Sequence, residues 1–254
     1  MNKKLQKLVK FNKVMAGLHF LQATTIVLIS SKFAVDVSTS YQVFDETTKT
    51  LNPQTKVLFD VKLAYLIAAF LFISAIAHLY ISFIAPKKYT SNLLKGINKT
   101  RWIEYSISAS LMMVAISLLT GIEDLSTLIM IFVLTAIMNL MGLVMEVHNQ
   151  TTKKTNWLSY NIGVLAGIIP WLIIGIYFWG GSSFGDSSPP TFVYWIYVSI
   201  FAFFNIFAIN MILQYKKVGP WKDYLYGERV YIILSLVAKS LLAWQVYAGT
   251  LRPV

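Results

Sequence analysis

Long apolar runs separated by short polar segments recur from one end of the chain to the other. A helix needs about 20 predominantly apolar residues to cross a bilayer, so the runs predict seven membrane-spanning helices. Their expected bounds are Val14 to Ser31, Phe59 to Ile84, Ser91 or Asn92 to Thr120, just after Ser126 to Glu146, Trp157 to Trp179, Phe192 to Tyr215 and Glu228 to Gly249. Pro170 lies inside the fifth helix and predicts a kink, because membrane helices tolerate proline.

The polar segments between these runs predict loops and one small sheet. Phe33 to Val57 is a long loop in which VSTSYQVF alternates as a strand does and FDETTK offers a turn, so a small β-hairpin is expected there. Ser91 or Asn92 is the expected N-cap of the third helix. GGSSFGDSSPP, between the fifth and sixth helices, has the composition of a flexible loop.

The composition is that of an all-α, polytopic membrane protein organised as one domain over residues 1–254. The chain is 56% hydrophobic and only 13% charged, which excludes an ordinary soluble domain. It has no cysteine, so disulfide bridges and thiolate metal sites are excluded. The net charge of +11 does not indicate nucleic acid, because the lysines flank the apolar runs as they do in membrane proteins.

The positive charges also predict the orientation of the chain in the membrane. Of the 22 lysine and arginine residues, sixteen fall on the side of the N-terminus and five on the opposite side, with Lys239 between them. Loops rich in lysine and arginine face the cytoplasm. We therefore expect a multi-pass protein of the cell membrane with a cytoplasmic N-terminus and an extracellular C-terminus.

Lys239 is the only charge away from the ends of the seventh run, and it lies near the middle. An amine at that depth needs a partner or a chemical modification. A desolvated lysine is a nucleophile that condenses with an aldehyde to form a Schiff base. A structural ion pair between helices, or a lysine whose side chain reaches the membrane surface, explains the residue equally well.

Glu104 is the only carboxylate expected well inside the membrane. Counted from a cap near Asn92 it lies about 18 Å along its helix, and Lys239 lies about 16 Å along its own helix counted from Glu228. Both helices are expected to run outward from the cytoplasmic side. An ion pair between Glu104 and Lys239 is therefore expected, because it would neutralise both charges.

Two histidines are expected at the level of this carboxylate. His19 lies in the cytoplasmic half of the first helix, and His78 lies near the cytoplasmic end of the second, with Ser74 one turn away. A lone histidine in a helix is usually an ordinary core residue, but two of them beside Glu104 favour a shared polar cavity that takes up a proton. No spacing supplies three convergent ligands, so no metal site is expected.

Two segments, RWIEYSISAS (101–110) and GERVYIILSLVAKSLLAWQ (227–245), closely resemble the heliorhodopsins. GIIPW (167–171) and FFNIFA with the LQYK that follows it are similar as well. The resemblance covers all seven spans, the long first loop and the inverted orientation. It implies a retinal protein that forms homodimers and whose N-terminus faces the cytoplasm.

The resemblance also implies roles for single residues. It implies all-trans retinal bound to Lys239 as a protonated Schiff base, with Glu104 as its counterion. Ser235 matches the serine beside the Schiff base, and His19 and His78 match the two histidines of the family's cavity. Light would isomerise the retinal and move the imine proton to Glu104 or to the histidine cavity.

The polyene of retinal needs a slot lined by aromatic and flexible apolar side chains. Ordinary packing between helices explains about half of the candidates as well. The candidates are Tyr105, Ser108, Met138, Met141, Gly142, Phe201, Phe203 and Phe204.

Ion pumping is not expected of this chain. Pumping rhodopsins carry a carboxylate four residues before the lysine, where this chain has Ser235. They carry another acid about three turns along the third helix, where this chain has none between Glu104 and Glu123. A pump needs a proton donor and an acceptor on opposite sides of the chromophore, so we predict a light sensor.

Two other classes of function remain open. A light-gated ion channel or transporter would use the same polar cavity as its pathway. A retinal-free enzyme or scaffold is not favoured, because the sequence has no nucleophile triad, phosphate loop or metal cluster. The basic loops 87–99 and 216–222 would contact membrane lipid, or else an unknown acidic partner in the cytoplasm.

Overall fold

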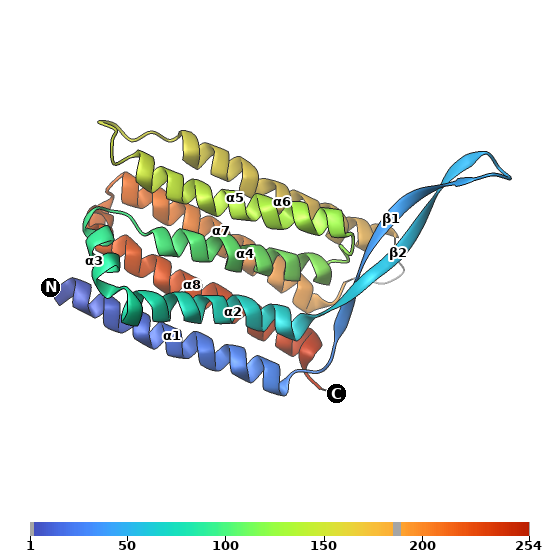
Figure 1. Ribbon diagram of the computed structural model, residues 1–254, viewed down its shortest axis with the longest axis horizontal. Helices are drawn as coiled ribbons and strands as arrows, with labels where there is room; N and C mark the ends of the chain where they lie inside the picture. The colour runs from blue at the N-terminus through green and yellow to red at the C-terminus, as the bar shows by residue number, and fades with distance from the viewer. Residues whose placement is uncertain (1–2, 185–188, 254) are drawn as a thin grey trace.

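The computed structural model describes residues 3–184 and 189–253, which form a helix bundle with a long β-hairpin at one end (Figure 1). Seven long helices run along the bundle in this part of the chain, as predicted. They are α1 (Lys3–Ile29), α2 (Leu63–Leu79), α4 (Lys99–Leu119), α5 (Leu125–His148), α6 (Leu158–Phe184), α7 (Thr191–Tyr215) and α8 (Tyr224–Val246).

Shorter helical elements extend or connect the long ones. The π-helical turns η1 (Tyr80–Ile84) and η3 (Tyr247–Leu251) continue α2 and α8, α3 (Pro86–Leu94) joins α2 to α4, and the 3-10 turn η2 (Gly219–Lys222) precedes α8. Six helical segments among the described residues are long and apolar enough to cross a membrane, judged by length and composition. α1 is more polar than these six because five lysines lie in its first half.

α4 occupies the centre of the bundle (Figure 1). It packs against α2 and α5 and also touches α6 and α7, while α8 packs against α1, α2 and α7. Fully buried apolar side chains such as Phe70, Ile116 and Leu242 join α2, α4 and α8 into one core. Polar side chains on the inner faces of these three helices therefore meet in the interior of the bundle.

The predicted hairpin is present and is longer than the sequence suggested. β1 (Ala34–Asp45) pairs with β2 (Thr50–Lys62) in antiparallel register, from Ala34 opposite Lys62 to Asp45 opposite Thr50. At its base, Ser38 N donates a 2.9 Å hydrogen bond to the carbonyl of Glu123 in the link between α4 and α5. The hairpin is therefore tied to the bundle only near its base, and its tip extends beyond the helices (Figure 1).

Four predicted helix starts are wrong, each for a local reason. α8 begins at Tyr224 and not at Glu228, because Asp223 caps it by accepting a 3.0 Å hydrogen bond from Leu225 N. α1 begins at Lys3 and not near Val14, because Leu5 and Leu8 bury an apolar stripe while the lysines stay exposed. α2 begins at Leu63 and not at Phe59, because residues 59–62 pair with β1. The third span begins at Lys99, because Asn98 caps it by accepting a 3.1 Å hydrogen bond from Arg101 N.

The basic loop before the third span therefore has structure of its own. Ser91 and Asn92, the expected cap residues, lie inside the short helix α3. Pro86 occupies the first turn of α3, where its missing N–H costs no hydrogen bond.

α6 continues through Pro170 and extends to Phe184. The first five residues of the predicted flexible loop, GGSSF, are therefore helical. Residues 185–188 of that loop lie outside the described residues.

Candidate functional site

Lys239 and Glu104 form a buried ion pair, as the sequence predicted. Lys239 Nζ lies 2.6 Å from Glu104 Oε1, and the two side chains are 4% and 8% exposed. The amine also donates to Ser74 Oγ at 2.7 Å and to Ser235 Oγ at 3.0 Å. All three donor positions of the ammonium group are thus satisfied, which offsets part of the cost of burying it.

Three helices supply this cluster. Ser74 comes from α2, Glu104 from α4, and Ser235 lies one turn before Lys239 on α8. The hydroxyl of Ser74 donates to Glu104 Oε1 at 2.6 Å while it accepts from Lys239. The carboxylate and the amine are thereby fixed relative to one another by a third element of the bundle.

The two predicted cavity histidines lie side by side. The rings of His19 and His78 are stacked, with 5.6 Å between their centroids and 8° between their planes. His19 is fully buried, and neither of its ring nitrogens has a hydrogen-bond partner among the described residues. His78 Nδ1 lies 2.6 Å from Asn12 Oδ1. The two histidines therefore share one location but have different hydrogen bonding.

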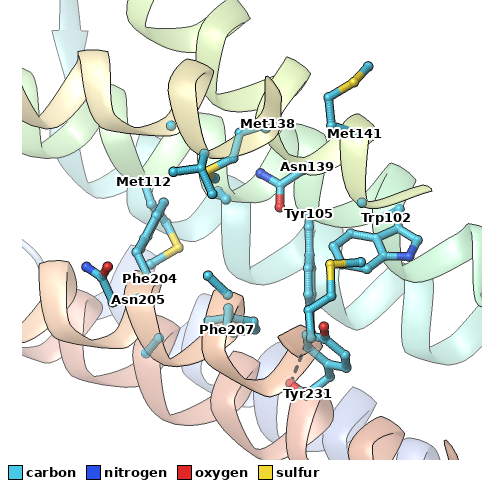
Figure 2. A pocket seen from close by; sticks show the side chains of 18 of the residues that line it. Trp102, Tyr105, Met112, Met138, Asn139, Met141, Phe204, Asn205, Phe207 and Tyr231 are labelled. Carbon is cyan, nitrogen blue, oxygen red and sulfur yellow. Dashed lines mark hydrogen bonds between the residues drawn. The ribbon is translucent and has the colours of Figure 1, made fainter. Parts of the chain in front are cut away.

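On the other side of the ion pair lies a cavity of about 210 Å³. Its walls are mainly apolar, and the Lys239 side chain lies at its edge. Figure 2 shows Met138 and Met141 on one wall, facing Phe204 and Phe207 on the other. The predicted residues that line it are Tyr105, Ser108, Met138, Met141, Gly142, Phe201, Phe204, Ser235 and Lys239.

Phe203 is the predicted pocket residue that does not line this cavity. It is partly buried and packs against the main apolar core instead. The reason is helical geometry, because residues 201, 204 and 205 share one face of α7 and residue 203 points about 100° away from residue 204.

Several wall residues were not predicted, although a periodic pattern in the sequence points to them. On α4 the lining residues Trp102, Tyr105, Ala109 and Met112 follow the spacing of one helical face. Trp171 of α6 stands against Phe201 and Phe204, with ring centroids 5.2 and 5.5 Å apart. Extending the face of α4 that holds Tyr105 would have found the α4 residues, whereas no candidate on α6 pointed to Trp171.

Two glycines allow large side chains to form the wall. A Cβ atom at Gly142 would overlap the ring of Trp102, and one at Gly167 would overlap the thioether of Met138. Trp102 is held in this position by a 2.7 Å hydrogen bond from its Nε1 to Glu146. Small residues on α5 and α6 therefore help to set the width of the cavity.

The cavity has the chemical character expected of a retinal site. A long conjugated polyene requires apolar and aromatic walls, and its aldehyde requires an amine at one end. The walls fit the first requirement and Lys239 fits the second. The buried hydroxyl of Ser108 and the ring of Tyr105, 5.1 Å from Lys239 Nζ, lie near the same end.

A second buried charge cluster lies closer to the end of the bundle that holds the N-terminus. Arg101 forms ion pairs with Glu146 on α5 and Glu228 on α8, and both carboxylate side chains are 1% exposed. Glu146 also accepts from Tyr224 OH at 2.9 Å. Glu104 is therefore one of three buried carboxylates among the described residues, and the other two, Glu146 and Glu228, lie near helix ends.

Comparison with known protein families gives one finding for this chain. Residues 8–251 match the model of a family described as Heliorhodopsin. No curated protein matches the chain.

Proposed function

The chain belongs to the heliorhodopsin family, and we propose that it senses light through retinal joined to Lys239, with Glu104 as the counterion. Family membership makes it a rhodopsin-type, retinal-binding membrane protein. The observation that supports the finer assignment is the buried pair of Lys239 and Glu104, 2.6 Å apart at the edge of an aromatic cavity.

Retinal supplies an aldehyde that condenses with an amine and a polyene that absorbs visible light and isomerises. The protein supplies the amine of Lys239 and holds its positive charge with Glu104, Ser74 and Ser235. A buried cation of this kind is stable only beside a buried anion. The aromatic residues Trp171 and Phe204 restrict the shape that the ligand can adopt.

We propose that light moves a proton within the protein and not across the membrane. Glu104 and Ser235, which accept hydrogen bonds from Lys239, lie closer than Lys239 to the end of the bundle where α8 begins. Glu146 and Glu228, the other buried carboxylates of the described residues, lie near that same end. Position 235 holds a serine, so α8 lacks the carboxylate that pumping rhodopsins carry four residues before the lysine.

We propose a cytoplasmic N-terminus for the same protein. The support is the excess of lysine and arginine on that side of the membrane, sixteen residues against five. A protease added outside intact cells should then cut the exposed hairpin and leave the N-terminal tail uncut.

Chemical trapping tests the attachment to Lys239. Full-length protein prepared with all-trans retinal is treated with borohydride, which reduces an imine to a stable secondary amine. Peptide mass mapping should then find the added mass on the peptide that contains Lys239. The exposed Lys154 is the matched control, since Lys154→Ala should leave the trapped yield unchanged. Trapping on another lysine, or none in a coloured sample, would contradict the proposal.

A further inference from the structure

A chain of hydrogen bonds leads from His78 to the second charge cluster. His78 Nδ1 lies 2.6 Å from Asn12 Oδ1, and Asn12 Nδ2 donates to Tyr89 OH at 3.1 Å. Tyr89 OH in turn lies 3.1 Å from Glu228 Oε1. Helices α2, α1, α3 and α8 each supply one member, and Asn12, Tyr89 and Glu228 are at most 4% exposed.

The direction of the first bond follows from the surroundings of Asn12. Its Nδ2 also donates to the carbonyl of Leu8 at 2.8 Å, and a carbonyl can only accept. The amide nitrogen is therefore fixed on that side, and the amide oxygen faces His78. Because an amide oxygen only accepts, His78 Nδ1 must carry the proton, which leaves Nε2 as the basic nitrogen when the ring is neutral.

The remaining bonds point in the same direction. Tyr89 OH accepts from Asn12, so its own hydrogen is available to Glu228. Burial, and then the nearby Glu228 carboxylate, raise the pKa of Tyr89 well above its ordinary value. The hydroxyl therefore stays protonated and donates. Each donor in the series points toward Glu228, whose other oxygen is paired with Arg101. Aligned bonds of this kind polarise one another.

His19 has no chain of hydrogen bonds comparable with that of His78. Its two ring nitrogens are buried, and in the part of the chain that the structure describes they have no hydrogen-bond partner, although the ring stacks on His78. The charged and titratable groups near His78 are His19 on α1, Glu104 on α4 and Lys239 on α8. Glu104 and His78 both line a small cavity of about 30 Å³, which has room for a water molecule between them.

We propose that Asn12, Tyr89 and Glu228 are positioning residues that make His78, and not His19, the proton-accepting histidine of the site, with Nε2 as the accepting atom. The inference rests on the proposed function. In the light Lys239 Nζ gives up a proton and His78 Nε2 gains it, so the net charge of the site is conserved. The resulting cation is stabilised through the aligned chain by the Glu228 carboxylate.

The tautomer of His78 is the first test. Solid-state NMR of full-length protein labelled with ¹⁵N-histidine, with retinal bound in lipid, reports which ring nitrogen carries a proton. The His78 signals are those lost in His78→Phe. We expect Nδ1 protonated and Nε2 bare in the dark. A proton on Nε2 in the dark, with or without one on Nδ1, overturns the inference.

The same spectrum can be recorded without retinal. A sample that never becomes coloured would overturn the proposed function, whereas the protonation of His78 would still be read. The two failures are therefore distinguishable.

Two variants test the chain of hydrogen bonds, because they should change the recovery rate of the visible band in opposite directions. Tyr89→Phe removes the bond to Glu228 and should speed the return of the visible band after a flash by about twofold to tenfold, the range for one lost hydrogen bond. Asn12→Asp places a carboxylate on His78 Nδ1 and should slow that return. Tyr226→Phe is the control, because its hydroxyl makes no hydrogen bond among the described residues.

A structural disturbance alone would move both variants in the same direction, so equal signs, or no change in either, overturn the inference. The rate is measured only for variants whose dark spectrum matches that of the wild type. If Tyr89→Phe does not fold, the sign of the Asn12→Asp effect decides, since a faster or unchanged return contradicts the proposal.

Discussion

Glu104 and Lys239 meet at 2.6 Å although they lie at different depths along their helices. The Asn98 side chain, which caps α4, donates to Glu228 at 2.7 Å, so these two residues mark a common level. From that level Glu104 is about 9 Å along α4 and Lys239 about 16 Å along α8. The long lysine side chain leans back toward the start of its helix and covers the difference. The pair therefore depends on the length of the lysine.

Removing the amine should abolish colour and also weaken the fold. Lys239→Ala leaves the Glu104 carboxylate buried without its cation, which should cost about 3–5 kcal/mol. We expect no visible absorption with all-trans retinal and a lower midpoint of thermal unfolding in detergent. The double variant Lys239→Ala with Glu104→Gln should recover much of the midpoint and remain colourless. A coloured Lys239→Ala sample would exclude attachment at this residue.

Replacing the counterion should change the colour of the bound pigment. Glu104→Gln removes the negative charge that stabilises the positive imine, so the visible band should move to the red. The protonated imine should also be lost at a lower pH than in the wild type. Absorption spectra across a pH titration measure both effects, and Glu104→Asp, which keeps the charge, is the control. An unshifted band in Glu104→Gln would assign the counterion elsewhere.

The glycine beside Trp102 should be intolerant of even one methyl group. Gly142→Ala forces the Trp102 ring to move, and overpacking of this kind costs about 1–3 kcal/mol. We expect a lower unfolding midpoint and a shifted visible band, because the ring lines the cavity. Gly180→Ala on α6 meets open space and should change neither quantity. If the two variants had the same unfolding midpoint and the same visible band, the close approach of Gly142 to the Trp102 ring would have no role.

The seven spans and the Glu104–Lys239 pair could be predicted because each depends on features visible within one helix. Apolar length predicts a span, and a charge in the middle of an apolar run predicts a buried partner. The hairpin was underestimated because residues 59–62 directly precede the apolar run of the second span and were read as its start. These residues form a strand because they pair with residues 34–37 of β1, and this pairing is not visible in the local sequence.

The second charge cluster could not be predicted for a different reason. Glu146 and Glu228 lie near helix ends, where charged residues usually face water. Their burial depends on Arg101, which lies within the third span and reaches both carboxylates at once. A contact shared by three helices leaves no periodic pattern in the sequence of any one of them.

Arg101 should be necessary for stability as long as its two partners are charged. Arg101→Met leaves Glu146 and Glu228 buried without a cation, at a cost of about 3–5 kcal/mol. Arg101→Lys should recover only part of this, because one ammonium group cannot match the fork that spans two carboxylates. Thermal unfolding of the variants in detergent measures the effect. If Arg101→Met with both partners changed to Gln is no more stable than Arg101→Met alone, the explanation is wrong.

Illumination should not drive net proton transport. The buried carboxylates of the described residues, Glu104, Glu146 and Glu228, lie in the half of the bundle between Lys239 and the start of α8, so no buried carboxylate of these residues lies on the opposite side. A pH electrode in a suspension of cells that contain the pigment should record no sustained change in light. A light-driven proton pump in the same cells is the positive control. A sustained signal that an uncoupler abolishes would show that a proton path to the far side exists, and the one-sided arrangement would then be insufficient to prevent pumping.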